Sequence, residues 1–143
     1  MILCDSNLLL YAYNPSARQH TIAANWLQAA LNGTETVGFC WPVLSAFLRI
    51  STNSRAFENA LTMEEAVDHV NAWLERETSQ VVLPTSDHWV VFTRLLKEGN
   101  VRGRTTTDAE IATYAVEHGA TLYTADQDFR RFPSLQFINP LGA

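Results

Sequence analysis

Apolar and polar positions along the chain follow two periods in turn, and this alternation predicts strands followed by helices. Short apolar runs of strand length are bounded by polar or turn-forming residues, as in the buried strands of a parallel sheet. Between these runs, apolar positions recur every three or four residues, which is typical of amphipathic helices. We expect five strands, at residues 1–4, 35–40, 80–84, 120–124 and 135–139.

The helical segments carry start signals of the kind that satisfy free backbone N–H groups. Ser16 with Gln19 and Thr62 with Glu65 both have capping-box spacing, and Thr107 is placed to cap the helix that Asp108 opens. We expect helices at residues 6–14, 16–32, 42–51, 63–77, 86–99 and 108–119.

Strands that alternate with helices predict an α/β fold with three layers, in which helices cover both faces of a parallel sheet of about five strands. The 143 residues show no internal repeat or linker, so we expect a single domain over residues 1–143. With 47% hydrophobic and 17% charged residues the composition is that of a globular chain. No apolar run reaches the roughly 20 residues that span a bilayer. No secretory signal is visible, and we expect a cytoplasmic protein with no membrane contact.

Charge and cysteine usage narrow the possible chemistry. The net charge of −5 argues against general coating of nucleic acid, but it is compatible with a nucleic-acid enzyme whose carboxylates bind a cation. Cys4 and Cys40 fall in strand-like runs without metal or redox spacing, so we expect reduced core thiols. The four histidines share no ligand spacing, which argues against a zinc site.

Four aspartates stand where secondary-structure elements begin or end. Asp5 follows the first strand, Asp126 and Asp128 follow the fourth, and Asp108 opens the helix that leads into the fourth. Each alone has a structural explanation as a helix cap or turn former. Together they favour another explanation, because reactive residues of parallel α/β sheets gather at the carboxyl ends of the strands.

Carboxylates that gather at one edge repel each other unless a cation offsets their charge. Mg²⁺ and Mn²⁺ are hard ions that prefer oxygen ligands, and they can orient a water molecule and help to deprotonate it. We therefore expect Asp5, Asp108 and Asp126 to meet at one edge of the sheet and to bind Mg²⁺ or Mn²⁺ there.

Several motifs resemble the PIN-domain family, and specifically VapC-type toxins of toxin–antitoxin pairs. They are "LCDSNLLLYAY", "WPVLSAFLRISTNSRAF", "TDAEIATYAVEHGATLYTAD" and "DQDFRRFPSLQFINPL". The resemblance implies a PIN fold with a five-stranded parallel sheet and an endoribonuclease dependent on Mg²⁺ or Mn²⁺. It implies that Asp5, Asp108 and Asp126 are catalytic, and that these three and the accessory acid Asp128 bind the metal. It also implies a homodimer, inhibition by a cognate VapB antitoxin, and DNA contact only through that antitoxin. The implied substrate is RNA, with transfer RNA or a ribosomal RNA loop as plausible targets.

The chain departs from the common PIN pattern at one position. Many PIN domains carry a glutamate in the helix after the second strand, whereas Ala46 stands at about that place, beside Ser45 as a polar helper. We expect an active enzyme. The alternative is a non-catalytic PIN-fold module that binds RNA or its antitoxin.

Arginines are the candidate contacts to RNA. Arg102 and Arg104 lie in the loop before Asp108 and suit phosphate binding. Arg49 has two open interpretations, a substrate contact and a solvated helix residue. For Arg130 and Arg131 two interpretations stay open, a contact with RNA and a contact with the antitoxin. The apolar helices "NLLLYAY" and "TIAANWLQAAL" form either a groove for an antitoxin helix or plain core.

Overall fold

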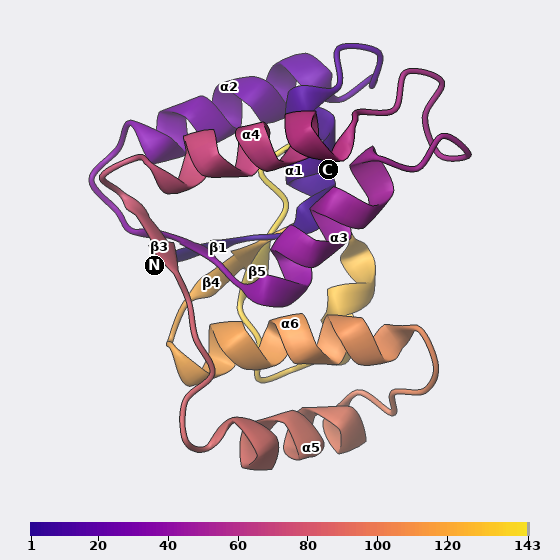
Figure 1. Ribbon diagram of the computed structural model, residues 1–143. Coiled ribbons are helices and arrows are strands. Elements are labelled where there is room, and N and C mark those ends of the chain that lie inside the picture. Colours follow the sequence, from indigo (N-terminus) through magenta and orange to yellow (C-terminus); the bar gives the residue numbers. More distant parts are fainter. Residues whose placement is uncertain (143) are drawn as a thin grey trace.

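The computed structural model describes residues 1–142, and its centre is a sheet of five parallel strands in the order β3-β2-β1-β4-β5 (Figure 1). Because every strand runs in the same direction, all of them end at one side of the sheet, which we call the carboxyl edge. The strands are β1 (Ile2–Cys4), β2 (Val37–Phe39), β3 (Ser79–Val81), β4 (Thr121–Tyr123) and β5 (Phe137–Ile138).

Helices cover both faces of the sheet, which confirms the expected α/β/α architecture. In Figure 1, α1, α2 and α4 lie above the sheet and α5 and α6 lie below it, while α3 packs against α1, α4 and α6. No helix within residues 1–142 is long and apolar enough to cross a membrane. The helices are α1 (Ser6–Tyr13), α2 (His20–Leu31), α3 (Trp41–Ser51), α4 (Met63–Leu74), α5 (His88–Glu98), α6 (Thr105–Glu117) and the 3-10 helix η1 (Gln127–Arg131).

The core is densest where α3 and α4 pack on the sheet. The Phe47 ring meets the Trp73 ring edge-on, with 4.8 Å between centroids, and the Phe39 ring lies parallel to Trp73 at 6.5 Å. Fully burying side chains of this size stabilises the fold by about 1.5–3 kcal/mol each. Gly38 lets Val82 pack close against β2, because a Cβ at position 38 would lie 2.6 Å from Cγ2 of Val82.

The two cysteines belong to this core, as predicted. Cys4 and Cys40 are both free and fully buried. They end up near one another because β1 and β2 are neighbours in the sheet. Burial raises the pKa of the Cys40 thiol to about 12, and it raises the pKa of Cys4 as well. Both are therefore neutral thiols at physiological pH, which leaves them poor nucleophiles.

One predicted capping box is confirmed and the other is wrong. At α4 the Thr62 backbone N–H donates to Glu65 and the Glu65 N–H donates to Thr62 Oγ1, at 3.0 and 3.1 Å. At the other position α2 begins at His20, four residues after Ser16. The Ser16 N–H instead donates to Oδ1 of Asn14, which makes a turn of the segment where the helix was expected.

A hydrogen-bonded network joins α5 to the carboxyl-terminal end of α6. The Glu117 side chain is only 2% exposed, and its Oε1 lies 2.7 Å from Nδ1 of His88. Thr85 donates to Glu117 twice, from Oγ1 at 2.8 Å and from its backbone N–H at 3.3 Å. Both oxygens of this buried carboxylate therefore have donors, as a stable buried charge requires.

Candidate active site

Asp5 is placed by the junction between β1 and α1. It directly follows the last residue of β1 and is the N-cap of α1, where its Oδ1 accepts the Ser6 N–H at 2.7 Å. The side chain is almost completely buried, with 5% of its surface exposed. The capping role considered from the sequence is therefore real, and the same geometry places the carboxylate at the carboxyl edge.

Asn7 and Thr124 connect this junction to the end of β4. Thr124 Oγ1 donates to Asp5 Oδ2 at 2.7 Å and accepts the Asp126 N–H at 3.0 Å. Asn7 Nδ2 donates to Thr124 Oγ1 at 3.2 Å, and Asn7 Oδ1 accepts the Ala125 N–H at 3.2 Å. These bonds bring together residues about 120 positions apart in the sequence. Both side chains belong to the site, and neither was predicted.

Asp126 and Asp128 sit on the turn that follows β4. Asp126 is the N-cap of η1, and its Oδ1 accepts the Asp128 N–H at 2.8 Å. Asp126 is partly buried, whereas Asp128 is exposed. The turn-forming explanation thus holds for Asp126, and the turn also holds both acids beside Asp5.

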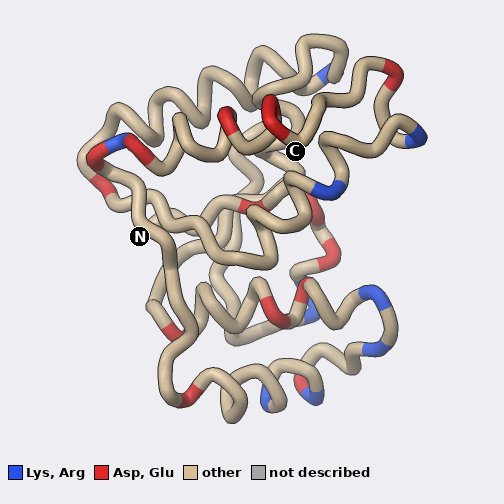
Figure 2. Tube along the Cα trace, in the orientation of Figure 1, with Lys and Arg blue, Asp and Glu red and all other residues tan. Residues whose placement is uncertain are grey.

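Asp108 lies in the first turn of α6 and not at its opening. The helix begins at Thr105, so the expected start at Asp108 with Thr107 as cap is wrong. Thr105 Oγ1 donates to the Arg102 carbonyl at 2.8 Å, which stabilises a tight turn just before the helix. Asp108 is half-buried in this first turn. Figure 2 shows the acidic positions of η1 and of the start of α6 at the same end of the molecule.

Asp108 lies close enough to the other three acids for their charges to act on it. Burial raises the pKa of Asp108 to about 6, assisted by the charges of Asp126, Asp5 and Asp128, while the charge of Arg131 lowers it. Burial also raises the pKa of Asp5, with a further contribution from Asp126, against hydrogen bonds that lower it. The predicted convergence at the carboxyl edge is therefore present.

The acids fit a hydrated divalent ion better than a closed metal cage. Within residues 1–142, no three His, Cys, Asp or Glu side chains are already arranged to hold an ion by themselves. Mg²⁺ demands less, because it keeps several waters and often takes one or two direct carboxylate ligands. All four donors are carboxylate oxygens, the ligand type that Mg²⁺ and Mn²⁺ prefer.

α3 contributes no acid to this edge. Ala46, at the place of the glutamate common in PIN domains, is buried, and Ser45 beside it is exposed. The three arginines proposed as RNA contacts are also exposed, Arg49 on α3 and Arg102 and Arg104 in the loop before α6. Figure 2 shows basic positions of that loop at the same end of the molecule as the start of α6. Their contact with RNA stays a prediction.

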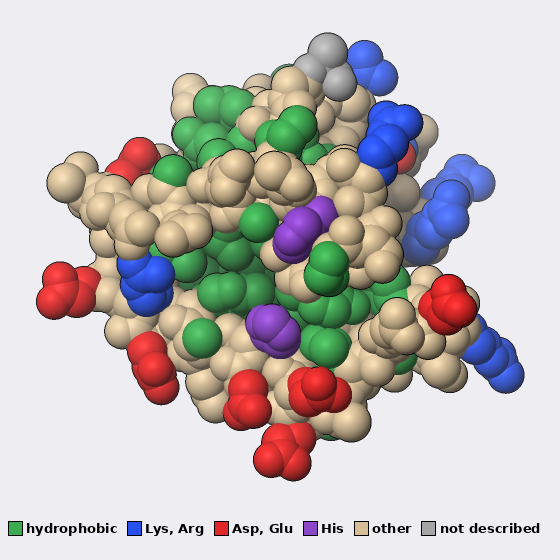
Figure 3. Space-filling model, turned by 90° about the horizontal axis from the view of Figure 1, so that it is seen from above, with side chains coloured by type: hydrophobic (Ala, Val, Ile, Leu, Met, Phe, Trp, Pro, Cys, Tyr) green, Lys and Arg blue, Asp and Glu red, His purple; other side chains and the backbone are tan. Residues whose placement is uncertain are grey.

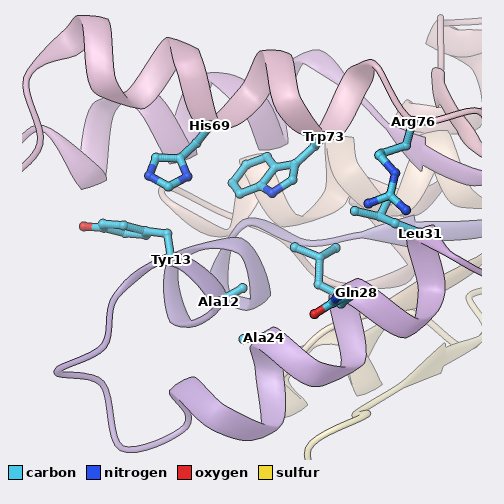
Figure 4. A pocket seen from close by; sticks show the side chains of 9 residues that line it. Ala12, Tyr13, Ala24, Gln28, Leu31, His69, Trp73 and Arg76 are labelled. Carbon is cyan, nitrogen blue, oxygen red and sulfur yellow. The ribbon is translucent and has the colours of Figure 1, made fainter.

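A separate groove lies on the opposite side of the sheet from α6. It has a volume of about 310 Å³ and lies between α1, α2 and α4. Figure 3 shows hydrophobic side chains at the floor of the hollow on this face, and Figure 4 shows His69 and Trp73 reaching into it from α4 and Tyr13 from α1. Arg76 lies at one end, where it donates to Asn32. None of the four aspartates lines this groove.

Comparison with known proteins gives one family throughout. The PIN domain family model matches residues 2–135. Ribonuclease VapC37 of Mycobacterium tuberculosis is 36% identical over 140 residues, which cover 98% of this chain and 97% of that protein.

Solved structures agree on the fold. VapBC2 from Rickettsia felis, bound to a DNA fragment from its promoter, matches with a TM-score of 0.67 and 22% identity over 97% of this chain and 98% of its own. VapC20 of Mycobacterium tuberculosis is a sarcin–ricin loop cleaving toxin. Its structure matches with a TM-score of 0.68 and 18% identity, over 95% of this chain and 99% of its own. At such identities the similarity supports the architecture alone.

Proposed function

Because this chain belongs to the PIN-domain family, we propose that it is a divalent-metal-dependent endoribonuclease and the toxin of a toxin–antitoxin pair. The observation that carries the proposal is the meeting of Asp5, Asp108 and Asp126 at the carboxyl edge, where their charges act on one another. Perturbed carboxylates in such an arrangement are typical of functional sites. The name of the ribonuclease VapC37, a relative at 36% identity, supports the same activity.

In this proposal Asp5, Asp108, Asp126 and Asp128 hold Mg²⁺ or Mn²⁺, some of them through water. When bound, such an ion orients a water molecule, lowers its pKa and offsets charge on the phosphate. The chain's own contribution is orientation. The donors Ser6 N–H and Thr124 Oγ1 fix both oxygens of Asp5, so that its carboxylate is held in place before any substrate arrives.

The substrate class is RNA, and we propose transfer RNA or a ribosomal RNA loop as the target. VapC20, which shares this fold, cleaves the sarcin–ricin loop, so a ribosomal loop is one of the two targets to test. Exposed Arg102 and Arg104 stand in the loop before Asp108, where they suit phosphate contacts. Arg49 is a weaker candidate for the same role.

The groove between α1, α2 and α4 suits the partner that would inhibit this enzyme. We propose that an amphipathic helix of a VapB-type antitoxin docks its apolar side chains there, because amphipathic helices bind hydrophobic grooves in this way. An Ala24→Arg substitution on the groove wall would block docking and leave RNA cleavage intact. Cleavage assays with and without the cognate antitoxin test this. We also propose a homodimer acting in the cytoplasm, and light scattering after size exclusion tests the dimer.

A second function is favoured by two observations. α3 carries Ala46 where many PIN domains have an acid, and the aspartates within residues 1–142 do not form a ready three-ligand group. Both would suit a PIN-fold module that binds RNA or its antitoxin without cutting. Metal dependence separates the two functions.

The deciding experiment incubates purified, antitoxin-free protein with total cellular RNA in Mg²⁺ or Mn²⁺. We expect discrete fragments that disappear with EDTA. Asp5→Asn and Asp126→Asn should each reduce the rate at least about 100-fold, because even residues that only orient a metal ligand are worth 10–100-fold. Asp87→Asn is the matched control, since Asp87 is an exposed aspartate at the start of α5.

Two outcomes would contradict the nuclease. Cleavage that survives EDTA and both variants would come from a contaminating enzyme. Wild-type protein that binds RNA with either metal but never cuts it would establish the binding module instead.

A further inference from the structure

Arg131 lies close to the aspartates at the carboxyl edge, and part of its guanidinium group lacks a hydrogen-bond partner. It is the last residue of η1, partly buried, and its Nε is buried without a hydrogen-bond partner within residues 1–142. Buried donors in folded proteins are almost always paired, and an unpaired one destabilises the fold. The neighbouring Arg130 differs, because it is exposed and its Nε donates to the Gln127 carbonyl at 3.1 Å.

Arg131 lies three residues after Asp128 on η1, about one turn of a 3-10 helix, and its charge acts on Asp108. It lowers the pKa of Asp108, against three acids that raise it. Yet no carboxylate within residues 1–142 forms an ion pair with Arg131, since the ion pairs there join the N-terminus to Glu35 and His88 to Glu117. The guanidinium therefore keeps donors free beside the carboxylates.

A nuclease that holds its metal with carboxylates must also attract a polyanion to a negatively charged edge. A cation inside that edge solves this, and a guanidinium suits it best, because its planar fork of N–H donors matches the oxygens of a phosphate. The exposed arginines on α3 and in the α5–α6 loop can attract RNA at longer range. Arg131 is the arginine whose charge reaches Asp108.

We propose that Arg131 contacts the RNA phosphate that lies at the carboxyl edge, with its unpaired guanidinium donors bonding the phosphate oxygens beside Asp108. This inference rests on the proposed ribonuclease function and adds a substrate-contacting residue to it. The phosphate would bond the terminal N–H groups of the guanidinium, which make no hydrogen bond within residues 1–142, while Nε stays buried behind them.

The test compares Arg131→Gln, Arg131→Lys and the matched neighbour Arg130→Gln with wild type. Cleavage is measured as kcat and KM on an RNA hairpin that spans a site the wild type cuts in total RNA. We expect Arg131→Gln to lower kcat/KM about 10- to 100-fold, the effect of losing hydrogen bonds to a charged group. Arg131→Lys should recover part of this loss, since it restores the charge but not the fork. Arg130→Gln should change kcat/KM less than about 3-fold, as exposed charges contribute little.

RNA binding in EDTA supplies a readout that a purely structural role would not change. Fluorescence anisotropy with labelled total transfer RNA gives the affinity over a range of salt concentrations. Loss of one phosphate contact should reduce the slope of log affinity against log salt by about 0.7, and only in Arg131→Gln. Thermal unfolding shows that each variant is folded, and Arg131→Lys carries the comparison if Arg131→Gln is not.

The outcomes separate this inference from the proposed function. Equal kcat/KM and equal salt slopes for Arg131→Gln and Arg130→Gln, in an active wild type, would overturn the phosphate contact and leave the nuclease intact. Unchanged RNA values with weaker inhibition by the cognate antitoxin would assign Arg131 to the antitoxin and overturn the contact too. A wild type that binds but does not cut, with the slope lost in Arg131→Gln, would uphold the contact and reject the nuclease. A wild type that does not bind RNA would reject both.

Discussion

The two ends of α6 carry carboxylates in opposite situations. At the carboxyl-terminal end, Glu117 is buried and receives hydrogen bonds from His88 and Thr85 at both oxygens. Near the amino-terminal end, Asp108 is half-buried, accepts no hydrogen bond within residues 1–142, and faces the charges of Asp5, Asp126 and Asp128. One helix thus carries a carboxylate whose oxygens both accept hydrogen bonds from the protein, and another whose negative charge is disfavoured by burial and by neighbouring acids.

This difference separates a structural acid from a functional one. The partners of Glu117 are all supplied by the protein, so its charge contributes to joining α5 to α6. Burial and the neighbouring acids disfavour the negative charge of Asp108, and a bound cation would offset this cost. Groups whose pKa the protein shifts away from its ordinary value are typical of functional sites. Burial alone does not distinguish the two, because Glu117 is the more deeply buried.

The largest effect on stability should come from a substitution at the carboxyl-terminal end of α6, where Glu117 lies. Glu117→Ala leaves His88 and two Thr85 donors without their acceptor, so the free energy of unfolding should fall by about 3 kcal/mol. Urea unfolding measures it. RNA cleavage at low temperature should persist, because Glu117 lies at the far end of α6 from the aspartates.

Glu98→Ala is the control for this substitution. Glu98 also accepts two hydrogen bonds, from the Ser134 N–H and Oγ at 2.8 and 2.7 Å, but at an exposed position. Its loss should cost less than about 1 kcal/mol, because water replaces the lost partner. Equal losses in the two variants would mean that the Glu117 network contributes no more than a surface contact.

The next effect in size is stabilisation by a metal ion bound near the amino-terminal end of α6, where Asp108 lies. At ten times its dissociation constant, Mg²⁺ or Mn²⁺ should raise the free energy of unfolding by about 1.4 kcal/mol. Differential scanning calorimetry against an EDTA-treated sample checks this. Glu117→Ala should keep the response, and Asp126→Asn should lose most of it. A response unchanged in Asp126→Asn would place the ion elsewhere.

A smaller effect of opposite sign to Glu117→Ala should follow from Asp108→Asn. Removing this charge relieves the cost of burying it and its repulsion with three acids, so metal-free protein should gain about 1 kcal/mol, after discounting for the solvent that screens a half-exposed side chain. Thermal unfolding in EDTA measures the gain. Cleavage should be lost at the same time. A destabilised Asp108→Asn protein would show that the carboxylate has a structural partner.

The sequence predicts the sheet well and the site in part. Strands such as β1 and β2 are buried at every position, so their apolar runs are visible in one dimension. Asp5 and Asp126 follow strands, and parallel pairing alone brings strand ends to one edge. The start of α6 was misplaced because Thr105 is as good a turn former as Thr107, and only the contact with the Arg102 carbonyl decides between them.

Asn7 and Thr124 show what the sequence could not give. Their polar side chains look ordinary in "DSN" and "TAD", and their importance lies in bonds across more than 115 residues. Arg131 is a similar case, because its buried Nε depends on how η1 packs. Side chains defined by a pairing between distant segments leave no periodic signal, whereas an acid after a strand does.

The smallest effect is the pH dependence of metal-free stability. The pKa of Asp108 is about 6 in the folded protein and lies near its ordinary value of 3.8 in the unfolded chain. The folded state therefore binds this proton first as pH falls, so the repulsion is fully present above pH 6 and disappears between about pH 6 and pH 4. The Asp5, Asp126 and Asp128 charges that oppose Asp108 outweigh Arg131, which favours it. In EDTA, wild type should thus gain stability relative to Asp108→Asn between pH 7.5 and pH 5. Comparing the two proteins at each pH cancels the histidines, which titrate in the same range. A difference that does not vary with pH would mean that neither burial nor the other acids raise the pKa of Asp108, and the contrast between the two ends of α6 would fail at its amino-terminal end.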